Sequence, residues 1–542
     1  MAHRTAHRNV RRRFSIVSAL AGLATALFVA APAPAFAAPA AVEPVPLTTA
    51  HAASSVYSLS VNGVSVPVNG YSGYDCAEFT MGAGEARIAV TKLNGTNVGA
   101  TYITPIKAGY VASHAGSTST FTIAGPQYLI VKLDGNRRLI ISAEREESNI
   151  PAVSGPGIFP ITAYGAVPDD AGADTTAGQQ AIDAASAYGS APGNPRGVVR
   201  IPFGAYQVAN LELRSNIEVY FVRGAVLRLI PDRSLYSIDA HKSSQNRDLT
   251  WWIQTEFGSE NITLRGHGTL DGRGQAAVAA GFGMNILAPI ATTNFRVEGL
   301  TVREAASWAV IPVRSDHLEF LNMKLFNRLD MGENDGIDVI ESQNVLVRDG
   351  VGIGLDDPYT TKSWPKNVGI TKNWPGDPED VRDVRFDRLI SWTYCYGFKV
   401  GQGVVNDHSN IRFTNSVVHD ASVGIGIHHK SGAGTADDVG FYNIDIERLT
   451  TSNDGNRTWL LLKIDDAYGD GAGPITNTLI RSINVRSAGT TPAVMKGFSA
   501  ASSVQNVLFD KIRMPGASGY ATTLADLNIT SPSFATGITI QP

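Results

Sequence analysis

The stretch ENITLRGHGTL (260–270) holds one unit of a pattern that recurs through the second half of the chain. A polar residue is followed by a run in which apolar and polar residues alternate, then by a turn and another short apolar run, as expected for two short strands. Seven more copies follow it, which are TNFRVEGLTV (293–302), DHLEFLNMKL (316–325), QNVLVRDGVGI (343–353), RDVRFDRLISW (382–392), SNIRFTNSVVH (409–419), DDVGFYNIDIE (437–447) and QNVLFDKIRM (505–514).

The leading polar residues of these units give the repeat length. They are Asn261, Asn294, His317, Asn344, Asp383, Asn410, Asp438, Asn477 and Asn506. A period of about 25 residues, lengthened in places by insertions, is typical of a solenoid, and strands in each repeat indicate a single-stranded parallel β-helix. A β-propeller is the less favoured alternative, because it requires longer and more regular blades.

Changes in composition divide the chain into five predicted segments. Residues 1–37 combine a basic start, an apolar run and the small-residue site Ala35-Phe36-Ala37, which together indicate a secretory signal peptide rather than a retained membrane anchor. The motif RRRFSIV also fits a twin-arginine signal, so we expect secretion by either export route. The segments that follow are a flexible lead at 38–55, a β-sandwich at 56–146, a linker at 147–158, and the β-helix at 159–542, whose first coil we expect a helix near 175–187 to cap.

The overall composition excludes several classes of partner. The net charge is −4 and the basic residues are scattered, so no nucleic-acid footprint is present. The two cysteines, Cys76 and Cys395, form neither a disulfide framework nor a metal-binding spacing, and we expect both to be small buried residues. We therefore expect a monomer without metal or cofactor, whose only partner is its substrate.

Three aspartates carry the candidate chemistry. Asp335 precedes the adjacent pair Asp356 and Asp357 by close to the length of one coil. Since neighbouring rungs stack at about 4.8 Å, Asp335 should lie directly beneath the pair. Mutual repulsion should then raise the pKa of at least one carboxyl group, which places a protonated acid beside an ionised base.

Four motifs resemble the polygalacturonases of glycoside hydrolase family 28, and they are YGAVPDD (164–170), GHGTLDGRG (266–274), NDGID (334–338) and LDD (355–357). The resemblance covers residues 159–515 and implies an all-β, right-handed, pectate-lyase-like parallel β-helix. It also implies an inverting glycoside hydrolase with Asp335, Asp356 and Asp357 as the catalytic set. In such a mechanism one carboxylic acid protonates the leaving oxygen while carboxylates opposite it activate water. We favour Asp356 as the acid, with Asp357 as the alternative, and assign the others to the base.

The sequence departs from that family where the family binds a uronate. In CYGFKVGQG (395–403) Tyr396 replaces a histidine, and in GIGIHHKSG (424–432) Gly426 and His428 stand where an arginine and a lysine are expected. Because an arginine fork is the natural partner of a carboxylate, its absence favours a neutral sugar. The preceding β-sandwich also resembles the dextranases and isopullulanases of glycoside hydrolase family 49, although their aspartate spacing is shorter.

The leading substrate is therefore a neutral, dextran-like α-glycan, with pectic galacturonan second. A polysaccharide lyase and a non-catalytic carbohydrate-binding β-helix are the alternatives of another class. The candidate substrate-binding residues are Asp338, Lys362, Trp364, Tyr396, Lys399, His428, His429 and Lys430. We expect the insertion at 363–380 to form a wall of the groove, because insertions in solenoids gather on a binding face. His267 and Asp271 are expected to be structural and to bond backbone groups.

Overall fold

The structure is a computed structural model that describes residues 40–452 and 455–542. The predicted signal peptide at 1–37 lies outside the described residues. Strands dominate the rest, and the helices are α1 (Thr175–Gly189), α2 (Gly274–Ala279) and the 3-10 turns η1 (Ile106–Ala108), η2 (Ile161–Tyr164), η3 (Arg233–Leu235) and η4 (Ser243–Gln245). Among these helices we find none with the length and apolar character that a membrane crossing requires.

Residues 42–145 form two sheets that share one apolar core. Apolar and exposed residues alternate along their strands, so one face of each sheet is buried. The first sheet contains β2 (Ala52–Ala53), β5 (Asn69–Gly70), β6 (Tyr74–Met81), β12 (Arg138–Arg145), β11 (Gln127–Leu133) and β8 (Thr101–Thr104), with β1 (Val42–Pro44) beside β6. The second contains β4 (Val64–Val66), β3 (Tyr57–Val61), β7 (Ala86–Lys92), β10 (Thr118–Ile123) and β9 (Ser113–Ala115).

The prediction of a flexible lead at 38–55 is wrong for most of that segment. Strand β1 pairs antiparallel with β6, and Val42 lies opposite Met81. Strand β2 pairs antiparallel with β5. These short strands occupy edge positions, where their backbone groups complete the hydrogen bonding of the first sheet. The Ala, Pro and Thr composition of the segment therefore reflects an edge of the sandwich.

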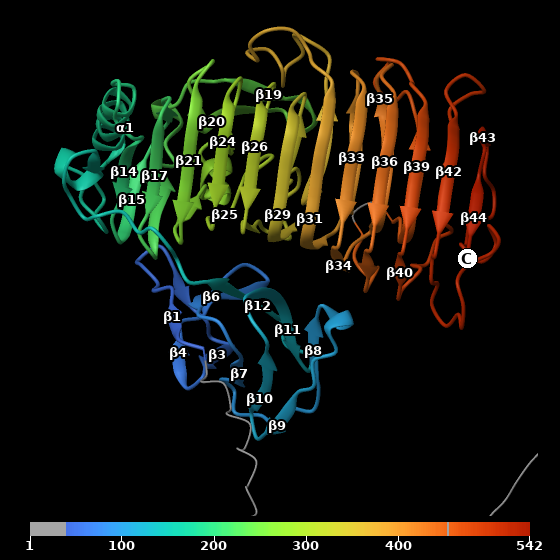
Figure 1. The fold of residues 1–542 in the computed structure, drawn as a ribbon, viewed down its shortest axis with the longest axis horizontal. Coiled ribbons are helices and arrows are strands. Elements are labelled where there is room, and N and C mark those ends of the chain that lie inside the picture. The colour runs from blue at the N-terminus through green and yellow to red at the C-terminus, as the bar shows by residue number, and fades with distance from the viewer. Residues whose placement is uncertain (1–39, 453–454) are drawn as a thin grey trace, which may run out of the picture. The chain divides into compact units, whose positions relative to one another are not determined.

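The repeats form one continuous parallel sheet of 22 strands (Figure 1). Parallel pairing throughout excludes the antiparallel blades of a β-propeller. In order the strands are β13 (Ile158–Pro160), β14 (Gly197–Ile201), β15 (Gly204–Val208), β17 (Ile217–Phe221), β18 (Ala225–Leu229), β21 (Glu260–Gly266), β22 (Thr269–Asp271), β24 (Thr293–Glu298), β25 (Thr301–Arg303), β26 (Asp316–Leu321), β27 (Lys324–Phe326), β29 (Gln343–Gly354), β31 (Val381–Thr393), β33 (His408–Thr414), β34 (Val417–Asp420), β36 (Ala436–Tyr442), β37 (Asp445–Ile446), β39 (Ile475–Arg481), β40 (Asn484–Val485), β42 (Val504–Asp510), β43 (Ala535–Thr536) and β44 (Thr539–Gln541).

The register of this sheet confirms the repeat read from the sequence. The apolar residue after each leading polar residue pairs with its counterpart one coil later, as Ile262 with Phe295 and Phe295 with Leu318. All nine leading polar residues have positive φ angles between 50° and 61°. Asn and Asp tolerate this left-handed conformation better than other residues with side chains, which explains why they recur at this corner.

A second strand row lies on the side of the coils that carries the candidate site. It begins with β16 (Leu211–Leu213), β20 (Arg247–Thr255) and β23 (Gly283–Ala288), while β19 (Ala240–Lys242) forms an antiparallel hairpin with β20. Single bridges through Val310 connect β23 to β28. The row continues as β28 (Ile337–Ile340), β30 (Tyr359–Ser363), β32 (Tyr396–Val404), β35 (Val423–Ser431), β38 (Thr458–Ile464) and β41 (Val494–Lys496).

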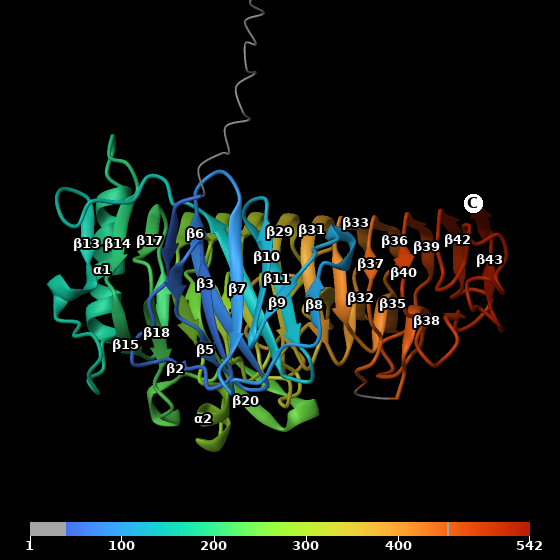
Figure 2. The same cartoon turned by 90° about the horizontal axis from the view of Figure 1, so that it is seen from below.

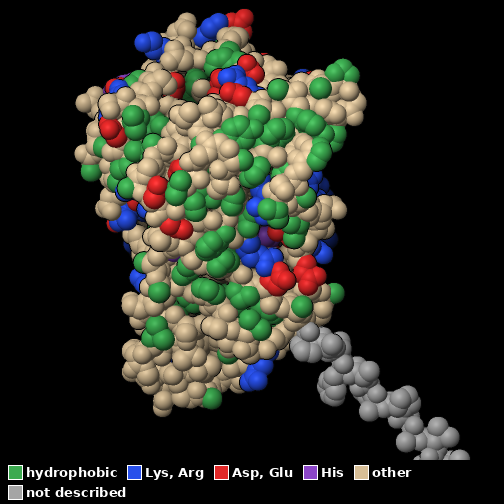
Figure 3. All heavy atoms as spheres, turned by 90° about the vertical axis from the view of Figure 1, so that its left-hand side faces the viewer, with side chains coloured by type: hydrophobic (Ala, Val, Ile, Leu, Met, Phe, Trp, Pro, Cys, Tyr) green, Lys and Arg blue, Asp and Glu red, His purple; other side chains and the backbone are tan. Residues whose placement is uncertain are grey.

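Helix α1 covers the first coil, as the sequence predicts. Its buried face packs against β13, β14 and β16, and it consists of Ala177, Gly178, Ala181, Ile182 and Ala185. Figure 2 shows the coils that follow, stacked in sequence order from β14 to β42. On the face seen in Figure 3, charged side chains of both signs are scattered among apolar and polar ones, in agreement with the small net charge.

The sandwich packs against the outer side of the long sheet. One apolar cluster combines Tyr74 and Ile130 of the sandwich with Phe326, Ile353 and Trp392 of the β-helix. The hydroxyl of Tyr74 also donates to the backbone oxygen of Asn327 at 2.9 Å. This shared core supports a packing role for the sandwich.

Candidate active site

The pair Asp356 and Asp357 lies in the turn between β29 and β30, outside regular strand structure. The amide side chain of Asn334 holds this turn from the coil below, because its Oδ1 accepts from the backbone nitrogens of Leu355 at 3.0 Å and of Asp356 at 3.2 Å. Strand alternation therefore does not apply to the pair, and both carboxylates lie on the site side of the coil.

Asp335 lies one coil below, in register with Asp357. The neighbouring backbone bond runs from the nitrogen of Gly336 to the oxygen of Asp357 at 3.0 Å, and the pairing continues with Ile337 opposite Tyr359. The interval between Asp335 and Asp357 is thus one full coil. The structure brings all three predicted catalytic aspartates together.

The three aspartates and the neighbouring Asp338 form a cluster of four carboxylates. Two buried lysines bind three of them. Nζ of Lys362 lies 2.6 Å from Oδ2 of Asp335 and 2.8 Å from Oδ2 of Asp338. Nζ of Lys399 lies 2.6 Å from Oδ2 of Asp357, whose Oδ1 accepts from the backbone nitrogen of Tyr396. In the described part of the chain, no lysine, arginine or histidine forms an ion pair with Asp356. Four carboxylates therefore share two cations.

This imbalance changes the acidity of the carboxyl groups. Burial, with the nearby charges of Asp356 and Glu333, raises the pKa of Asp335 to about 6 although Lys362 opposes the rise. Burial and the charge of Asp357 raise the pKa of Asp356, and burial raises the pKa of Asp338 well above its ordinary value. The Oδ1 atoms of Asp335 and Asp338 are buried without a hydrogen-bond partner in the structure. The cluster therefore retains a proton and offers an unused acceptor.

A cavity of about 650 Å³ opens above the cluster. Asp335 and Asp356 line it, whereas Asp357 is 1% exposed and lies behind them. A cavity of this size is typical of a site that encloses one small ligand. The remaining residues of its wall are His241, Lys242, Ser243, Ser244, Trp308, Glu333, Lys362, Trp364, Pro365, Val368, Gly369, Ile370, Gln402, Lys430, Tyr468 and Asp470.

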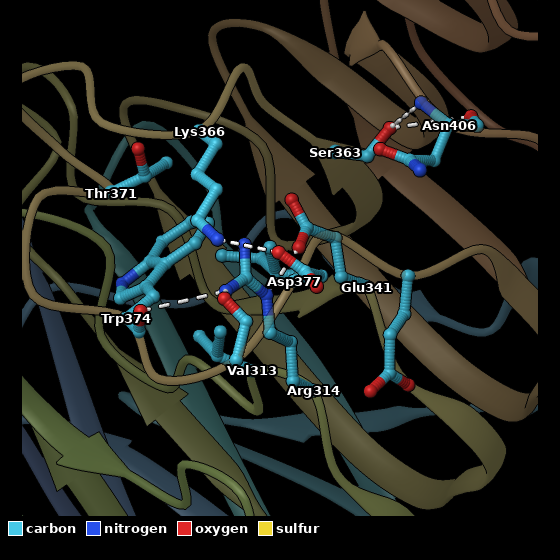
Figure 4. Close-up of polar contacts among 12 residues, drawn as sticks. Val313, Arg314, Glu341, Ser363, Lys366, Thr371, Trp374, Asp377 and Asn406 are labelled. Atoms are coloured by element: carbon cyan, nitrogen blue, oxygen red, sulfur yellow. Dashed lines mark hydrogen bonds and ion pairs between the residues drawn. The ribbon is translucent and has the colours of Figure 1, made fainter.

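The insertion at 363–380 forms one wall of this cavity, as its position in the sequence predicts. A buried ion pair between Arg314 and Glu341 anchors it, because Arg314 Nη1 donates to the backbone oxygens of Pro375 and Gly376 (Figure 4). Glu341 in turn accepts from the backbone nitrogen of Trp364. The wall is therefore tied to the coils beneath it.

The structure divides the predicted substrate-binding residues into two groups. Lys362, Trp364 and Lys430 line the cavity. Those that do not are Asp338, Tyr396, Lys399, His428 and His429.

Several of this second group support the cavity from behind. The hydroxyl of Tyr396 lies 3.1 Å from Nδ1 of His428, and Nε2 of His428 lies 3.1 Å from Oδ2 of Asp465. Lys399 binds Asp357, and Asp338 is a member of the carboxylate cluster that binds Lys362. For His429 the prediction is wrong, because its fully buried ring bonds the backbone oxygen of Gly434 at 2.7 Å and points into the coil.

The tryptophans near the aspartate pair have different roles. Trp364 is partly exposed and stacks against Trp308, with ring centroids 6.1 Å apart. Trp374 is buried beneath the insertion, and Trp392 belongs to the core shared with the sandwich. Only Trp364 of these three therefore presents an indole to the cavity.

His267 and Asp271 are structural, but their partners are mainly side chains. His267 Nδ1 lies 3.1 Å from Glu78 Oε1, and Asp271 Oδ2 accepts from Arg303 at 2.8 Å and from Arg228 at 3.1 Å. The predicted backbone partners are wrong for most of these contacts, because sequence alone did not show that the sandwich and the helix corner meet here.

Among the described residues, two side-chain groups have ligand atoms close enough to hold a metal ion, and neither fits one well. The first contains Asp356, Asp357 and Cys395, but both oxygens of Asp357 are already occupied by Lys399 and Tyr396. The second contains Glu78, Glu144 and His267, between which the ammonium group of Lys324 binds. A bound ammonium group fills the position that a cation needs.

Sequence analysis missed several residues of the cavity wall. Lys242 ends β19 and Gln402 lies in β32, whereas Trp308, Glu333 and Tyr468 lie outside regular strands, and none of the five shares a sequence motif with the others. Glu333 was the easiest of them to predict from the sequence, because it stands just before Asn334 and Asp335 in the same motif. The others become neighbours only when the coils stack.

Comparison with known proteins places the fold. No protein-family model matches the chain. In sequence, 285 residues, or 50% of the chain, align at 24% identity with a probable polygalacturonase of Vitis vinifera. That alignment covers 56% of the grape protein, so the chain spans about half the length of the curated relative that it matches.

Solved structures extend this likeness to the whole fold. Dex49A from Penicillium minioluteum aligns with a TM-score of 0.55 at 13% identity, over 92% of this chain and 96% of its own. An exopolygalacturonase from Thermotoga maritima aligns with a TM-score of 0.50 at 16% identity, over 73% and 93%. A polygalacturonase from Erwinia carotovora aligns with a TM-score of 0.50 at 14% identity, over 71% and 99%.

These matches confirm the predicted fold class, a right-handed parallel β-helix of the kind seen in families 28 and 49. The two polygalacturonases cover about the share of the chain that residues 159–542 represent. The match with Dex49A is longer and so extends into the sandwich strands. The fold of the chain thus resembles solved structures from both families.

Proposed function

We propose that this protein is a secreted, inverting glycoside hydrolase that cleaves an extracellular polysaccharide. The observation that carries the proposal is the charge imbalance at the floor of the cavity, where four carboxylates share two lysines. Such a cluster supplies a protonated carboxylic acid and an ionised carboxylate side by side, which glycoside hydrolysis requires.

In the proposed mechanism Asp356 is the general acid. It faces the cavity, binds no cation, and has a raised pKa, so it holds a proton for the leaving oxygen. Asp335 is the general base, because it lines the cavity and its Oδ1 has no hydrogen-bond partner, so that this oxygen can take a proton from a water that enters with the substrate. In one step water attacks the anomeric carbon, Asp335 takes a proton from that water, the glycosidic bond breaks, and Asp356 protonates the departing oxygen.

Asp357 acts through its neighbour. Lys399 and the backbone nitrogen of Tyr396 bind its carboxylate behind the cavity. Its negative charge then helps to keep the proton on Asp356. Lys362 has the opposite effect on Asp335, because its ammonium group favours the ionised base.

A neutral, dextran-like α-glycan is the substrate class that we favour. No arginine lines the cavity in the described part of the chain, so the planar fork that binds a uronate carboxylate is missing there. The partly exposed indole of Trp364 offers apolar surface against which a sugar ring can pack.

Pectic galacturonan is the second candidate, and one observation favours it. Lys430 lines the cavity and forms no ion pair with a described carboxylate, while its Nζ lies 5.3 Å from the ring centre of Tyr468. A lysine in this state can bind a substrate carboxylate as a point charge.

A panel of purified polysaccharides tests the proposal. We expect new reducing ends from dextran or pullulan, an inverted anomeric configuration by NMR immediately after cleavage, and no absorbance from an unsaturated sugar. Faster cleavage of polygalacturonate would select the second candidate. An unsaturated product would indicate a lyase, and binding without any cleavage would indicate a carbohydrate-binding β-helix.

A further inference from the structure

The hairpin β19–β20 belongs to an earlier coil than the carboxylates, but its tip extends to the cavity above them. Strand β20 is separated from β28 by two rungs, which are β23 and the bridge at Val310. With rungs stacked at about 4.8 Å, this corresponds to roughly 14 Å along the helix axis. The tip of the hairpin nevertheless lies in the wall of the cavity, through Lys242, Ser243 and Ser244.

Two sets of contacts hold the hairpin against the loops on either side of the carboxylates. On one side, Nζ of Lys242 lies 3.0 Å from Glu333 Oε2 and the hydroxyl of Ser244 donates to Glu333 Oε1 at 2.8 Å. On the other side, the backbone nitrogen of His241 donates to the oxygen of Gly369 at 2.9 Å, and Asn373 Nδ2 donates to the oxygen of Asp239 at 2.8 Å. The cavity is therefore bridged on the side of the N-terminal coils.

The opposite side of the cavity is narrowed by a second bridge. The ring of Trp364 lies 6.3 Å from that of Tyr468, measured between centroids, and the Tyr468 hydroxyl donates to Gln402 Oε1 at 3.0 Å. The wall thus runs from the hairpin through the insertion and Tyr468 to β32. A polymer threaded through the site along the helix axis would have to pass through one of these bridges.

We infer that the site is a pocket for the end of a chain, so that the protein releases mono- or short oligosaccharides from polymer ends and does not cut within a chain. The inference rests on the proposed hydrolase function and specifies how that site acts. The hairpin tip at 242–247, which is tied to Glu333 and follows directly on the tie from His241 to Gly369, is the element that determines this specificity. Glu333 serves as its anchor beside Asp335.

The first test follows product size with the wild-type protein on the polymer that it cleaves best. We expect short products from the earliest time points and almost unchanged viscosity while reducing ends accumulate. With oligosaccharides that carry a bulky cap at one end or the other, we expect one of the two caps to reduce cleavage by about tenfold or more, as a group that clashes with a closed pocket should. An early fall in viscosity, or equal cleavage of both capped forms, would overturn the inference.

The second test opens the wall. Replacing residues 242–247 by Asn-Gly joins His241 to Asp248, which already lie opposite each other, through the two-residue turn that suits a hairpin. We expect this variant to produce larger fragments and to lower viscosity sooner for each bond broken. The double variant Lys242→Ala/Ser244→Ala removes only the ties to Glu333 and should move the products in the same direction. The control Ser234→Ala changes an exposed residue of the same segment that bonds only Asp232, and it should keep the wild-type product pattern.

The two proposals fail in distinguishable ways. If no polymer or oligosaccharide is cleaved, the hydrolase proposal fails, and binding then tests the pocket by itself. Trp308 and Trp364 line the cavity, so their fluorescence reports occupancy by linear oligosaccharides. A pocket for chain ends should bind uncapped chains more tightly than chains capped at both ends, whereas equal binding of the two would overturn the inference.

Discussion

Two buried clusters of carboxylates and amines in this protein differ in their balance of charge. At the interface between the sandwich and the helix, Glu78 and Glu144 face Lys324 and His267, so two acids meet two bases. Beneath the cavity, four acids meet two bases, and they are Asp335, Asp338, Asp356 and Asp357 with Lys362 and Lys399. Each cluster is buried except for one half-buried carboxylate, Glu78 in the first and Asp356 in the second, so burial alone does not distinguish them.

The balance of charge does distinguish them. At the interface burial would raise the pKa of Glu78, but Lys324 and His267 lower it to about 2. Beneath the cavity the pKa values of Asp335 and Asp356 are raised, and two carboxylate oxygens are left without partners. A balanced cluster holds two parts of a fold together, while an unbalanced one keeps a proton that chemistry can use.

The largest expected effect is on turnover in the unbalanced cluster. We expect Asp356→Asn and Asp335→Asn each to lower kcat by about a hundredfold or more, because each removes one half of the acid–base assistance. Initial rates on the best polymer of the panel measure this, and a thermal melt within a few degrees of wild type shows that the fold survives.

The matched control for these variants is Asp377→Asn. Asp377 is an exposed residue of the insertion that pairs with Lys366, so it shares the region and the chemistry of the change but not the cluster. Its turnover should stay within about twofold of wild type, since exposed ion pairs contribute little. Near-normal turnover in Asp356→Asn and Asp335→Asn together would refute the assignment of the site.

The second largest expected effect is a loss of protein stability when the balanced cluster at the interface loses its lysine. Lys324→Met leaves Glu78 and Glu144 buried without their main cation, and we expect the free energy of unfolding to fall by about 3–5 kcal/mol. The surface variant Lys366→Met should cost less than about 1 kcal/mol. Denaturant unfolding measures both, and turnover of Lys324→Met below its melting temperature should be unchanged. A loss of turnover without a loss of stability would mean that the interface cluster serves the reaction.

Sequence predicted the coils and the aspartates at the floor of the cavity because both depend on spacing. The leading residues such as Asn294 and Asn344 mark the left-handed corner of each coil, and that corner recurs whenever the chain completes a turn. The same rule placed Asp335 under Asp357 from their separation along the chain. One-dimensional periodicity is enough here, since each coil contacts mainly its neighbours.

Apart from the insertion at 363–380, the walls could not be predicted in this way. Lys242 and Tyr468 stand far from the aspartates in sequence, and they reach the cavity through a hairpin and a loop whose lengths follow no period. His429 illustrates the opposite error, because it follows His428 directly but its side chain points into the coil, as neighbouring residues of a strand alternate. The partners of His267 were missed because the sandwich supplies them.

The third prediction uses the pH dependence of stability at the interface. Hydrogen bonds and charges from Glu144 and Glu78 overcome the effect of burial and raise the pKa of His267 to about 9, above the ordinary value of 6.5. The folded state therefore holds this proton more tightly, so its contribution is complete below pH 6.5 and is lost as the pH rises through 9. At 1.36 kcal/mol per pKa unit this is on the order of 3 kcal/mol. The fall in unfolding free energy between pH 6 and pH 9.5 should thus be smaller in His267→Gln than in wild type, and equal falls would contradict a charged His267.

The smallest expected effect is a shift of the pH profile in the unbalanced cluster. Lys362 lowers the pKa of Asp335 by attraction, and burial with Asp356 raises it to about 6. Lys362→Met leaves the four carboxylates with only one lysine, so Asp335 should ionise only at higher pH. The acid limb of the kcat/KM profile should therefore move to higher pH by roughly one unit. Asp357→Asn should act on the other limb, because removing the charge beside Asp356 lets the acid lose its proton at lower pH. A purely structural role for Lys362 and Asp357 would lower the rate without moving either limb. If four acids share two bases, Lys362→Met should therefore move the acid limb to higher pH, and Asp357→Asn should move the basic limb to lower pH. Each variant thus narrows the profile from one side.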